Sequence, residues 1–163
     1  MNALRALALL GATLTMGLAA GVFALYAHTI MPGLKKTDDR TFVAAFQSID
    51  RAIINPWFMT TAFGGALVFT LAGLLTNLGE SALPWVAAAL ALYAIVVVIT
   101  IAVNVPLNDA IKAAGDPNQI DLAAVRVRFG EARWAAWNLV RAALSVAAFA
   151  CLAWSLVEDG RSS

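Results

Sequence analysis

The sequence predicts an all-α integral membrane protein: a four-helix bundle with up-down-up-down topology and amphipathic connector helices on one side. Three observations lead to this fold class. Hydrophobic residues make up 61% of the chain, charged residues only 13%, and the mean hydropathy is +0.80, well above the range of soluble domains. Three long runs contain no charged residue, and a fourth contains a single arginine. The polar segments between these runs show helical periodicity.

The composition also limits the classes of function. A net charge of +1 provides no basic surface for nucleic acid. The single cysteine, Cys151, excludes an internal disulfide and a cysteine-rich metal site. We expect one domain, 1–163, because four membrane spans use most of the 163 residues.

The first span is expected at about residues 6–31. The run from Ala6 to Leu34 has no charged residue and is about twice as long as the apolar region of a signal peptide, so it predicts a transmembrane helix. This helix should end at Met31-Pro32-Gly33. His28, the only histidine of the chain, lies one turn before that end.

An amphipathic connector helix is expected over residues 38–53. Thr37 is a candidate N-cap, and Asp38 and Asp39 suit the positive N-terminal end of a helix. One face carries an apolar stripe, formed by Phe42, Phe46, Ile49 and Ile53. The opposite face carries Arg40, Gln47 and Arg51. Such a helix lies in the membrane interface or packs over the bundle.

A second, shorter connector helix is expected over residues 117–129. Asp116, Pro117 and Gln119 have the spacing of a cap, a first-turn proline and a capping-box glutamine, and Gly130 marks the end. The alternation of apolar residues and arginines from Val125 to Phe129 leaves a short strand as an open alternative.

The remaining spans are expected at about residues 57–78, 84–105 and 134–157. Asn55-Pro56 begins the second span as an N-cap and a first helical residue. The third closes on Asn104-Val-Pro-Leu-Asn108, whose two amides lie on one helical face. The fourth contains Arg141, roughly 10 Å inside a helix that starts near Trp134. A charge at that depth is costly and normally faces a bundle interior.

The topology predicts that one layer of the bundle collects the polar side chains. In an up-down-up-down bundle, the C-terminal ends of helices one and three lie beside the N-terminal ends of helices two and four. This layer contains His28, Asn55, Asn104, Asn108, Arg133, Asn138 and Arg141, whereas the other side should hold only the termini and a short turn. A structural interpretation stays open, in which Arg141 snorkels or pairs with Asp50 or Asp109 and the amides only bridge helices.

Together these motifs resemble the DUF1772, or anthrone oxygenase-like, family of small four-span membrane proteins. The resemblance covers nearly the whole chain and rests on His28 with Met31-Pro32, the connector from Phe42 to Asn55, the Asn104-to-Asn108 element, and Arg133-Trp134 with Trp137, Asn138 and Arg141. It implies a four-span fold. It also implies the oxidation of anthrones to anthraquinones, known from polyketide pathways, without a bound cofactor.

The polar layer contains the residue types that such an oxidation requires. A base that removes a proton beside a ketone produces an enolate, which can pass an electron to dioxygen. The site also needs cations or donors for the developing oxyanion and an apolar chamber with aromatic surfaces for the rings. We expect the catalytic residues to be His28 as base, Arg141 and Asn108. We expect the substrate-binding residues to be Asn55, Asn104, Arg133, Trp134, Trp137 and Asn138.

Two other classes of function stay open. In the first, the protein is a redox protein that binds haem or a metal through His28; no Cys or Met stands at ligand spacing from it, and Met31 and Met59 are the candidate second ligands. In the second, it is a non-enzymatic tetraspan scaffold or partner protein, in which Trp134 and Trp137 are interfacial belt residues. Such a scaffold should tolerate His28→Ala and Asn108→Ala.

The expected surroundings follow from the same features. We expect an integral protein of a bacterial cytoplasmic membrane that contacts the lipid bilayer, binds a hydrophobic small molecule, binds no nucleic acid and can form homo-oligomers. The connectors carry eight basic residues, at positions 35, 36, 40, 51, 112, 126, 128 and 133, and the other side carries only Arg5 and Arg161. The positive-inside rule therefore places the connectors in the cytoplasm and both termini outside.

Overall fold

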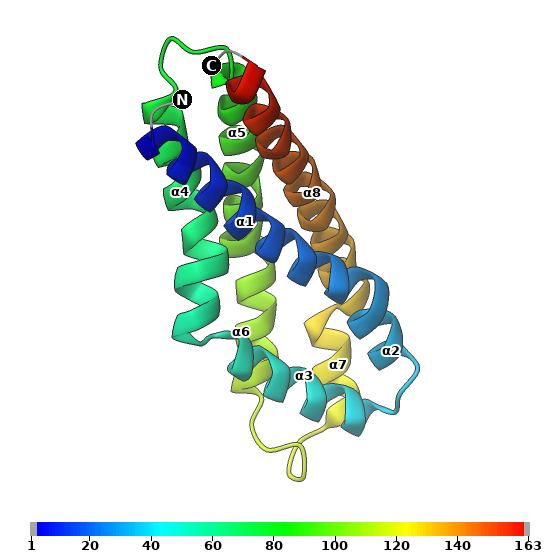
Figure 1. Ribbon diagram of the computed structural model, residues 1–163. Helices are drawn as coiled ribbons and strands as arrows, with labels where there is room; N and C mark the ends of the chain where they lie inside the picture. The colour runs from blue at the N-terminus through cyan, green and yellow to red at the C-terminus, as the bar shows by residue number, and fades with distance from the viewer. Residues whose placement is uncertain (1–2, 162–163) are drawn as a thin grey trace.

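The structure, a computed structural model, describes residues 3–161, and this range is helical with no strand. The bundle consists of α1 (Ala3–Leu25), α4 (Gly64–Thr76), α5 (Leu83–Ile99) and α8 (Glu131–Arg161). Helix α1 packs against α4 and α8, and α5 packs against α8 and, less extensively, α4 (Figure 1). With their continuations, four helices are long and apolar enough to cross a membrane. The predicted all-α membrane bundle is confirmed.

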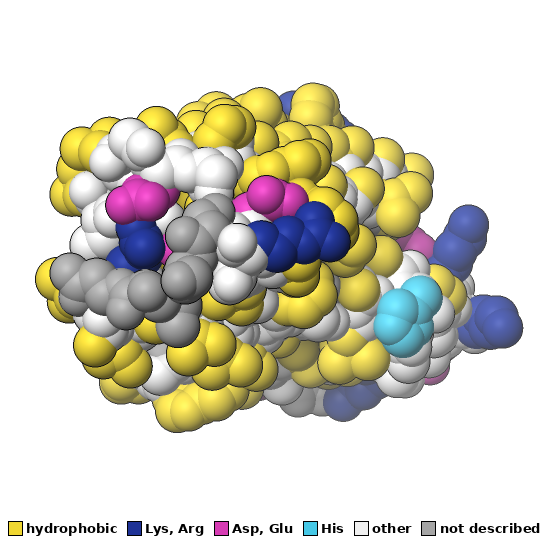
Figure 2. All heavy atoms as spheres, turned by 45° about the horizontal axis from the view of Figure 1, so that its top comes forward, with side chains coloured by type: hydrophobic (Ala, Val, Ile, Leu, Met, Phe, Trp, Pro, Cys, Tyr) yellow, Lys and Arg dark blue, Asp and Glu magenta, His cyan; other side chains and the backbone are white. Residues whose placement is uncertain are grey.

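The bundle has an apolar core and an apolar outer surface. The core contains Leu9, Met16, Val86, Tyr93 and Leu152, all fully buried. Many Leu, Val and Ile side chains of the same helices are exposed and cover the outside, as Figure 2 shows. An outer surface of this kind faces lipid rather than water.

The end of the bundle that carries both termini is more polar than the sequence suggested. Arg5 of α1 pairs with Glu80 of the turn between α4 and α5, and its Nε lies 2.8 Å from Oδ1 of Asp159 in α8. Asp159 is only 2% exposed. This side thus consists of the two terminal segments and a short turn, as expected, and ion pairs join the three.

The opposite end carries the connector helices α3 (Asp39–Ile53), α6 (Val105–Ala113) and α7 (Leu122–Phe129), as Figure 1 shows. The cap of α3 is Asp38, whose Oδ1 accepts from the Thr41 amide at 3.0 Å, and hydrogen bonds from the side chain and amide of Thr41 lower the pKa of Asp38. Thr37, the expected cap, donates to the Leu34 carbonyl instead.

The residues from Asp116 to Gln119 form a turn rather than the expected first turn of a helix. Asp116 Oδ1 accepts from the Asn118 amide at 2.9 Å, which closes the turn. Helix α7 begins later, at Leu122, where Asp121 Oδ1 accepts from the Ala124 amide at 3.0 Å. It ends at Gly130, which has a φ of 66° and separates α7 from α8. The segment from Val125 to Phe129 is therefore helix, not strand.

Three π-helical turns interrupt the spans near the connector end: η1 (Tyr26–Ile30), η2 (Phe58–Phe63) and η3 (Thr100–Asn104). Two of them directly precede a helical segment with a proline at its start, Pro32 in α2 (Met31–Lys35) and Pro106 in α6. A wider turn accommodates the missing amide and the ring of proline. The first helix therefore continues to Lys35 and the third to Ala113, beyond their expected ends.

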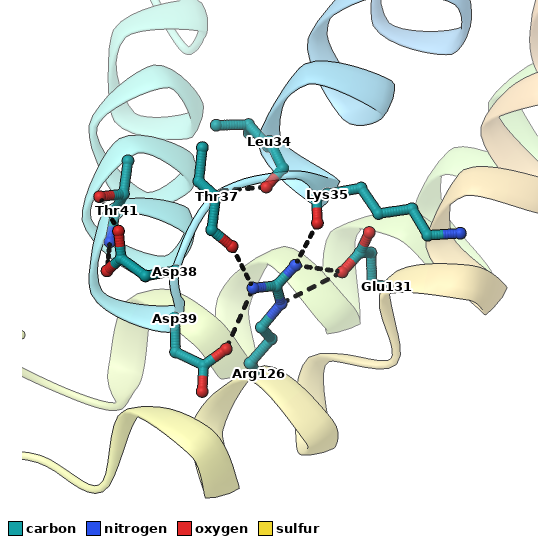
Figure 3. Close-up of polar contacts among 8 residues, drawn as sticks. All are labelled: Leu34, Lys35, Thr37, Asp38, Asp39, Thr41, Arg126 and Glu131. Carbon is teal, nitrogen blue, oxygen red and sulfur yellow. Dashed lines mark hydrogen bonds and ion pairs between the residues drawn. The ribbon is translucent and has the colours of Figure 1, made fainter.

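Arg126 of α7 holds the connector end together (Figure 3). Its Nη1 donates to the Thr37 carbonyl at 2.9 Å and to Asp39 at 3.0 Å. Its Nη2 donates to the Lys35 carbonyl at 3.2 Å and to Glu131 at 3.0 Å. The guanidinium also lies 4.3 Å from the centre of the Phe42 ring. One side chain thus joins the end of α2, the start of α3 and the start of α8.

Candidate functional site

A cavity of about 270 Å³ lies at the connector end of the bundle. All three π-helical turns contribute to its wall: Tyr26 from η1, Phe58, Met59 and Phe63 from η2, and Thr100 and Ile101 from η3. Turns of this type occur frequently at functional sites. The rest of the wall comes from α1, α3, α6 and α8, through Val22, Phe23, Asp50, Ile53, Ile54, Val105, Asn108, Asp109, Lys112, Trp134 and Arg141.

Arg141 is the buried cation of this cavity and is 5% exposed. Its Nη2 donates to Asn138 Oδ1 at 2.9 Å and its Nη1 to Thr100 Oγ1 at 3.2 Å. The guanidinium carbon lies 4.6 Å from the centre of the Phe23 ring and 5.6 Å from that of Trp134. All these partners are neutral. Among residues 3–161, Arg141 forms no ion pair, and its Nε has no hydrogen-bond partner.

Arg141 therefore neither pairs with an aspartate nor snorkels, the two roles that a purely structural interpretation gave it. Asp50 and Asp109, its expected partners, instead bind Lys112, whose Nζ lies 2.8 Å from Asp50 Oδ2 and 3.1 Å from Asp109 Oδ1. Arg141 also does not snorkel, because its side chain is buried. A desolvated cation without a carboxylate partner attracts an anion or a partial negative charge on a ligand.

A chain of short hydrogen bonds forms a second polar group in the same wall. Asn108 Nδ2 donates to Asp50 Oδ1 at 2.6 Å, and Asn108 Oδ1 accepts from Trp134 Nε1, also at 2.6 Å. Lys112 completes the chain through Asp50. The indole thus fixes the orientation of the amide, and the amide fixes the carboxylate.

Aromatic packing holds Trp134 in place. The Phe46 ring meets it edge-on at 5.5 Å between centres, and Tyr26 lies 5.6 Å away. Phe129 packs on Phe46 at 4.5 Å, and Phe42 joins the cluster at 5.8 Å from Phe129. These rings come from α3, α7, η1 and α8, so the connector helices support Trp134 from behind the cavity wall.

Two of the predicted amides lie behind the wall rather than in it. Asn138 is fully buried, accepts from Arg141 and donates to the Phe23 carbonyl at 3.0 Å. Asn104 is 1% exposed, and its Nδ2 lies 3.4 Å from the Trp134 carbonyl. Both are positioned to orient lining residues of the cavity.

Four other predicted site residues do not reach the cavity. His28 is exposed, and its Nδ1 lies 2.6 Å from Thr29 Oγ1. Arg133 and Trp137 are exposed on the outer side of α8. Asn55 caps the second span, as expected for that position, because its Oδ1 accepts from the Phe58 amide at 2.9 Å. The prediction that His28 and Arg133 share one pocket with Arg141 is thus not supported by the geometry.

Helical periodicity explains these placements. His28 follows the buried Tyr26 by two positions, which is about half a turn around the helix. The buried residues of α8 include Trp134, Asn138, Arg141 and Ser145, whereas Arg133 and Trp137 each precede a buried residue by one position, about 100° away. The sequence placed Arg133, Trp134, Trp137, Asn138 and Arg141 on one side of α8, but only Trp134 and Arg141 of this set line the cavity.

The structure also adds residues that the sequence analysis did not select for the site: Tyr26, Asp50, Thr100 and Lys112. Asp50 follows Phe46 by four positions and precedes Ile53 by three, so it lies on the apolar stripe of α3. That position was a usable signal of a buried carboxylate. Gln47, assigned to the polar face, is also buried, and its Nε2 donates to the Ile111 carbonyl at 2.8 Å.

The cavity has an apolar mouth on the side of the bundle. Four of its apolar lining residues are exposed: Ile54 and Met59 beside the second span, and Ile101 and Val105 on the third, with exposed fractions of 59%, 40%, 64% and 40%. This mouth therefore opens on the apolar outer surface of the bundle.

Within residues 3–161 there is no cluster of three or more His, Cys, Asp or Glu side chains that could hold a metal ion. A family model described as anthrone oxygenase matches residues 45–151, more than half of the chain. The chain belongs to the anthrone oxygenase family. This confirms the resemblance read from the sequence. No curated protein and no solved structure matches the chain.

Membership of the anthrone oxygenase family indicates an oxygenase-like role at the level of the family. The matched region begins after His28 and Tyr26, and it contains the other polar residues of the cavity wall, which are Asp50, Thr100, Asn108, Asp109, Lys112 and Arg141. The family match therefore includes most of the cavity wall, whereas the part formed by Val22, Phe23 and Tyr26 lies outside it.

Proposed function

We propose that this anthrone oxygenase family member oxidises a flat, anthrone-like ketone with dioxygen inside the cavity. The observation that carries the proposal is Arg141, a buried cation that faces an apolar cavity and has only neutral partners among the described residues. The ground-state ketone is neutral, but its enolate is an anion. The site is therefore suited to the charge that develops during the reaction rather than to the substrate.

The proposed reaction balances without an added reductant. A base takes one proton from the CH₂ group opposite the ketone, and the C–H electron pair forms the enolate. The enolate gives one electron to dioxygen, and the resulting carbon radical and superoxide combine into a peroxide. After protonation, the hydroperoxide loses water and leaves a second carbonyl. One anthrone and one O₂ thus become one anthraquinone and one water.

Arg141 is proposed to stabilise both anions of this sequence, the enolate and then superoxide. Asn138 and Thr100 fix the guanidinium by accepting from Nη2 and Nη1, while Nε is left without a protein partner among residues 3–161. A planar fork held in this manner can donate to an oxyanion at low reorganisation cost. Lysine keeps the charge but loses the fork.

The walls suit a hydrophobic substrate that arrives from the membrane. A volume of about 270 Å³ is close to the lower end of small-molecule sites, which begin at roughly 300 Å³. The rings of Phe58, Phe63 and Trp134 provide aromatic surfaces, and the mouth beside Met59 and Ile101 gives access from lipid. Exclusion of water also strengthens the electrostatic effect of Arg141.

The test uses the full chain in lipid nanodiscs with anthrone and dissolved oxygen. Oxygen consumption and anthraquinone absorbance are compared with the rate without protein. The wild type should exceed that rate, and Arg141→Met and Arg141→Lys should each lower kcat by about 10²–10³-fold, the usual effect of losing an oxyanion donor. Arg51→Met, which removes an exposed arginine of α3, is the control and should keep full activity. Equal rates for the wild type and Arg141→Met would overturn the proposal.

We also propose that the reaction needs no resident cofactor, in contrast to the haem alternative. The absorbance spectrum of the purified protein separates the two. A Soret band that is lost in His28→Ala would replace this part of the proposal with a haem protein, whereas an active protein with only aromatic absorbance supports it.

A further inference from the structure

The proposed oxidation needs a proton acceptor, and the exposed His28 does not face the cavity. The titratable side chains that line the cavity, within the described chain, are Tyr26, Asp50, Asp109, Lys112 and Arg141. Asp109 has a 63% exposed side chain at the rim, so Asp50 is the buried carboxylate of this set.

Asp50 is held in one position from two sides. Asn108 donates to its Oδ1 at 2.6 Å, and Lys112 Nζ lies 2.8 Å from its Oδ2. A carboxylate has about four acceptor sites on its two oxygens, so these two contacts leave further lone pairs free to take a proton. The residue is 5% exposed, which excludes bulk water from it.

Asp50 and Arg141 approach the same cavity from different elements. Asp50 comes from α3 and Arg141 from α8, and Tyr26 of η1 lines the same cavity. Trp134 links the two groups, because its Nε1 donates to Asn108, which in turn donates to Asp50, and its ring lies beside the guanidinium. A ketone in this space can present its C–H to the carboxylate and its oxygen to the guanidinium.

Ketosteroid isomerase uses the same division of labour, with an aspartate that removes a proton beside a ketone and separate donors that hold the enolate oxygen. We propose that Asp50 is the base of this protein and that Asn108 is its positioning residue, an inference that rests on the proposed function. An Asp50 oxygen takes the proton, and the C–H electron pair becomes the enolate opposite Arg141. The proton then passes to the peroxide anion, which restores the carboxylate.

Proton removal is measured apart from oxidation by hydrogen exchange without oxygen. The full chain in nanodiscs is incubated anaerobically with anthrone in D₂O, and deuterium at the CH₂ group is followed by NMR. The wild type should accelerate exchange over the protein-free rate. Asp50→Asn should lower this acceleration, and aerobic kcat, by about 100-fold or more, the contribution of a general base. Asp116→Asn, at an exposed carboxylate of the connector, is the matched control and should exchange at the wild-type rate.

The Asp50→Asn variant could fail to fold, because it leaves Lys112 without its buried partner. A second pair of variants tests the base without this complication. Lys112→Met alone should keep exchange measurable, because the carboxylate remains. The double variant Asp50→Asn/Lys112→Met removes the ion pair as a unit and should lose exchange while still binding anthraquinone, measured by quenching of tryptophan fluorescence.

The two proposals fail in different ways. A wild type that neither binds nor oxidises anthrone overturns the proposed function and the base with it. A wild type that oxidises anthrone, together with an Asp50→Asn variant that still exchanges deuterium at the wild-type rate, overturns only the assignment of Asp50.

Discussion

Asn108 Nδ2 donates a hydrogen bond of 2.6 Å to Asp50 Oδ1, so the third span and the first connector helix are joined inside the cavity wall. The direction of this amide is set, because its oxygen accepts from Trp134 Nε1 at 2.6 Å. An asparagine is suited to the position since it carries a donor and an acceptor on one rigid group. The bond that attaches the connector helix α3 to the third span therefore also fixes two side chains of the cavity wall.

The first prediction concerns this amide. Asn108→Ala removes one donor and one acceptor from partly buried partners and should destabilise the protein by about 1–3 kcal/mol. Asn108→Asp should be worse, because it sets a second carboxylate against Asp50. Unfolding midpoints in detergent and anthrone oxidation rates measure both effects. An Asn108→Asp variant as stable and active as the wild type would show that this bond is not needed.

Much of the fold could be predicted from the sequence because lipid imposes a simple rule. Every span must be apolar and helical, and the charge-free runs before residue 35 and on either side of residue 80 reveal this directly. The first connector was equally readable, since Phe42, Phe46 and Ile53 mark the buried face of α3. Helix ends were harder to place, because the π-helical turns let Pro32 and Pro106 stay within helices.

The site was only partly predictable, because the sequence shows which residues are polar but not which side of a helix faces the cavity. Arg141 and Asn108 stood out as polar residues in apolar surroundings, and both line the cavity. His28 stood out equally, but half a turn of helix separates it from the cavity face. Asp50 lay within a polar connector where acidic residues are common, so only its register with Phe46 marked it. Residue type identified candidate side chains, whereas register along the helix decided which of them line the cavity.

A second prediction tests entry of the substrate from the membrane. Ile101→Trp places a larger side chain at the mouth of the cavity and should raise KM for anthrone by about tenfold, the equivalent of about 1.4 kcal/mol. Ile95→Trp is the control, because Ile95 is exposed on the same span but does not line the cavity. Equal KM values for the two variants would place the entrance elsewhere.

Arg126 supplies a third prediction. Arg126→Ala removes hydrogen bonds to the Thr37 carbonyl, Asp39 and Glu131, and hydrogen bonds to charged groups contribute about 1.5–3 kcal/mol each. We expect a lower unfolding midpoint and faster amide exchange in α3 and α7 than in the spans. Arg128→Ala, at an exposed arginine of the same helix, should change neither quantity. Unchanged exchange in α3 would show that aromatic packing alone holds the connectors.

Orientation in the membrane is the fourth prediction. The connector end carries eight basic residues and the opposite end Arg5 and Arg161, so the positive-inside rule places the connectors in the cytoplasm and both termini outside. An alkaline phosphatase fused to the C-terminus should then be active. An inactive fusion, with a bright fluorescent-protein fusion at the same point, would reverse the orientation.

The last prediction separates the effect of the Arg141 charge on stability from its proposed role in the reaction. Burial of a cation costs several kcal/mol, and here no described carboxylate repays it. Arg141→Met loses the bond to Asn138 Oδ1, worth about 1–3 kcal/mol, but it also removes the charge. We therefore expect an unfolding midpoint equal to the wild type or higher by about 2–4 °C for each kcal/mol gained. Asn138→Leu keeps the charge, removes its acceptor and should lower the midpoint. A loss of stability in Arg141→Met as large as in Asn138→Leu would mean that the arginine anchors the bundle, and the scaffold interpretation would replace the oxygenase.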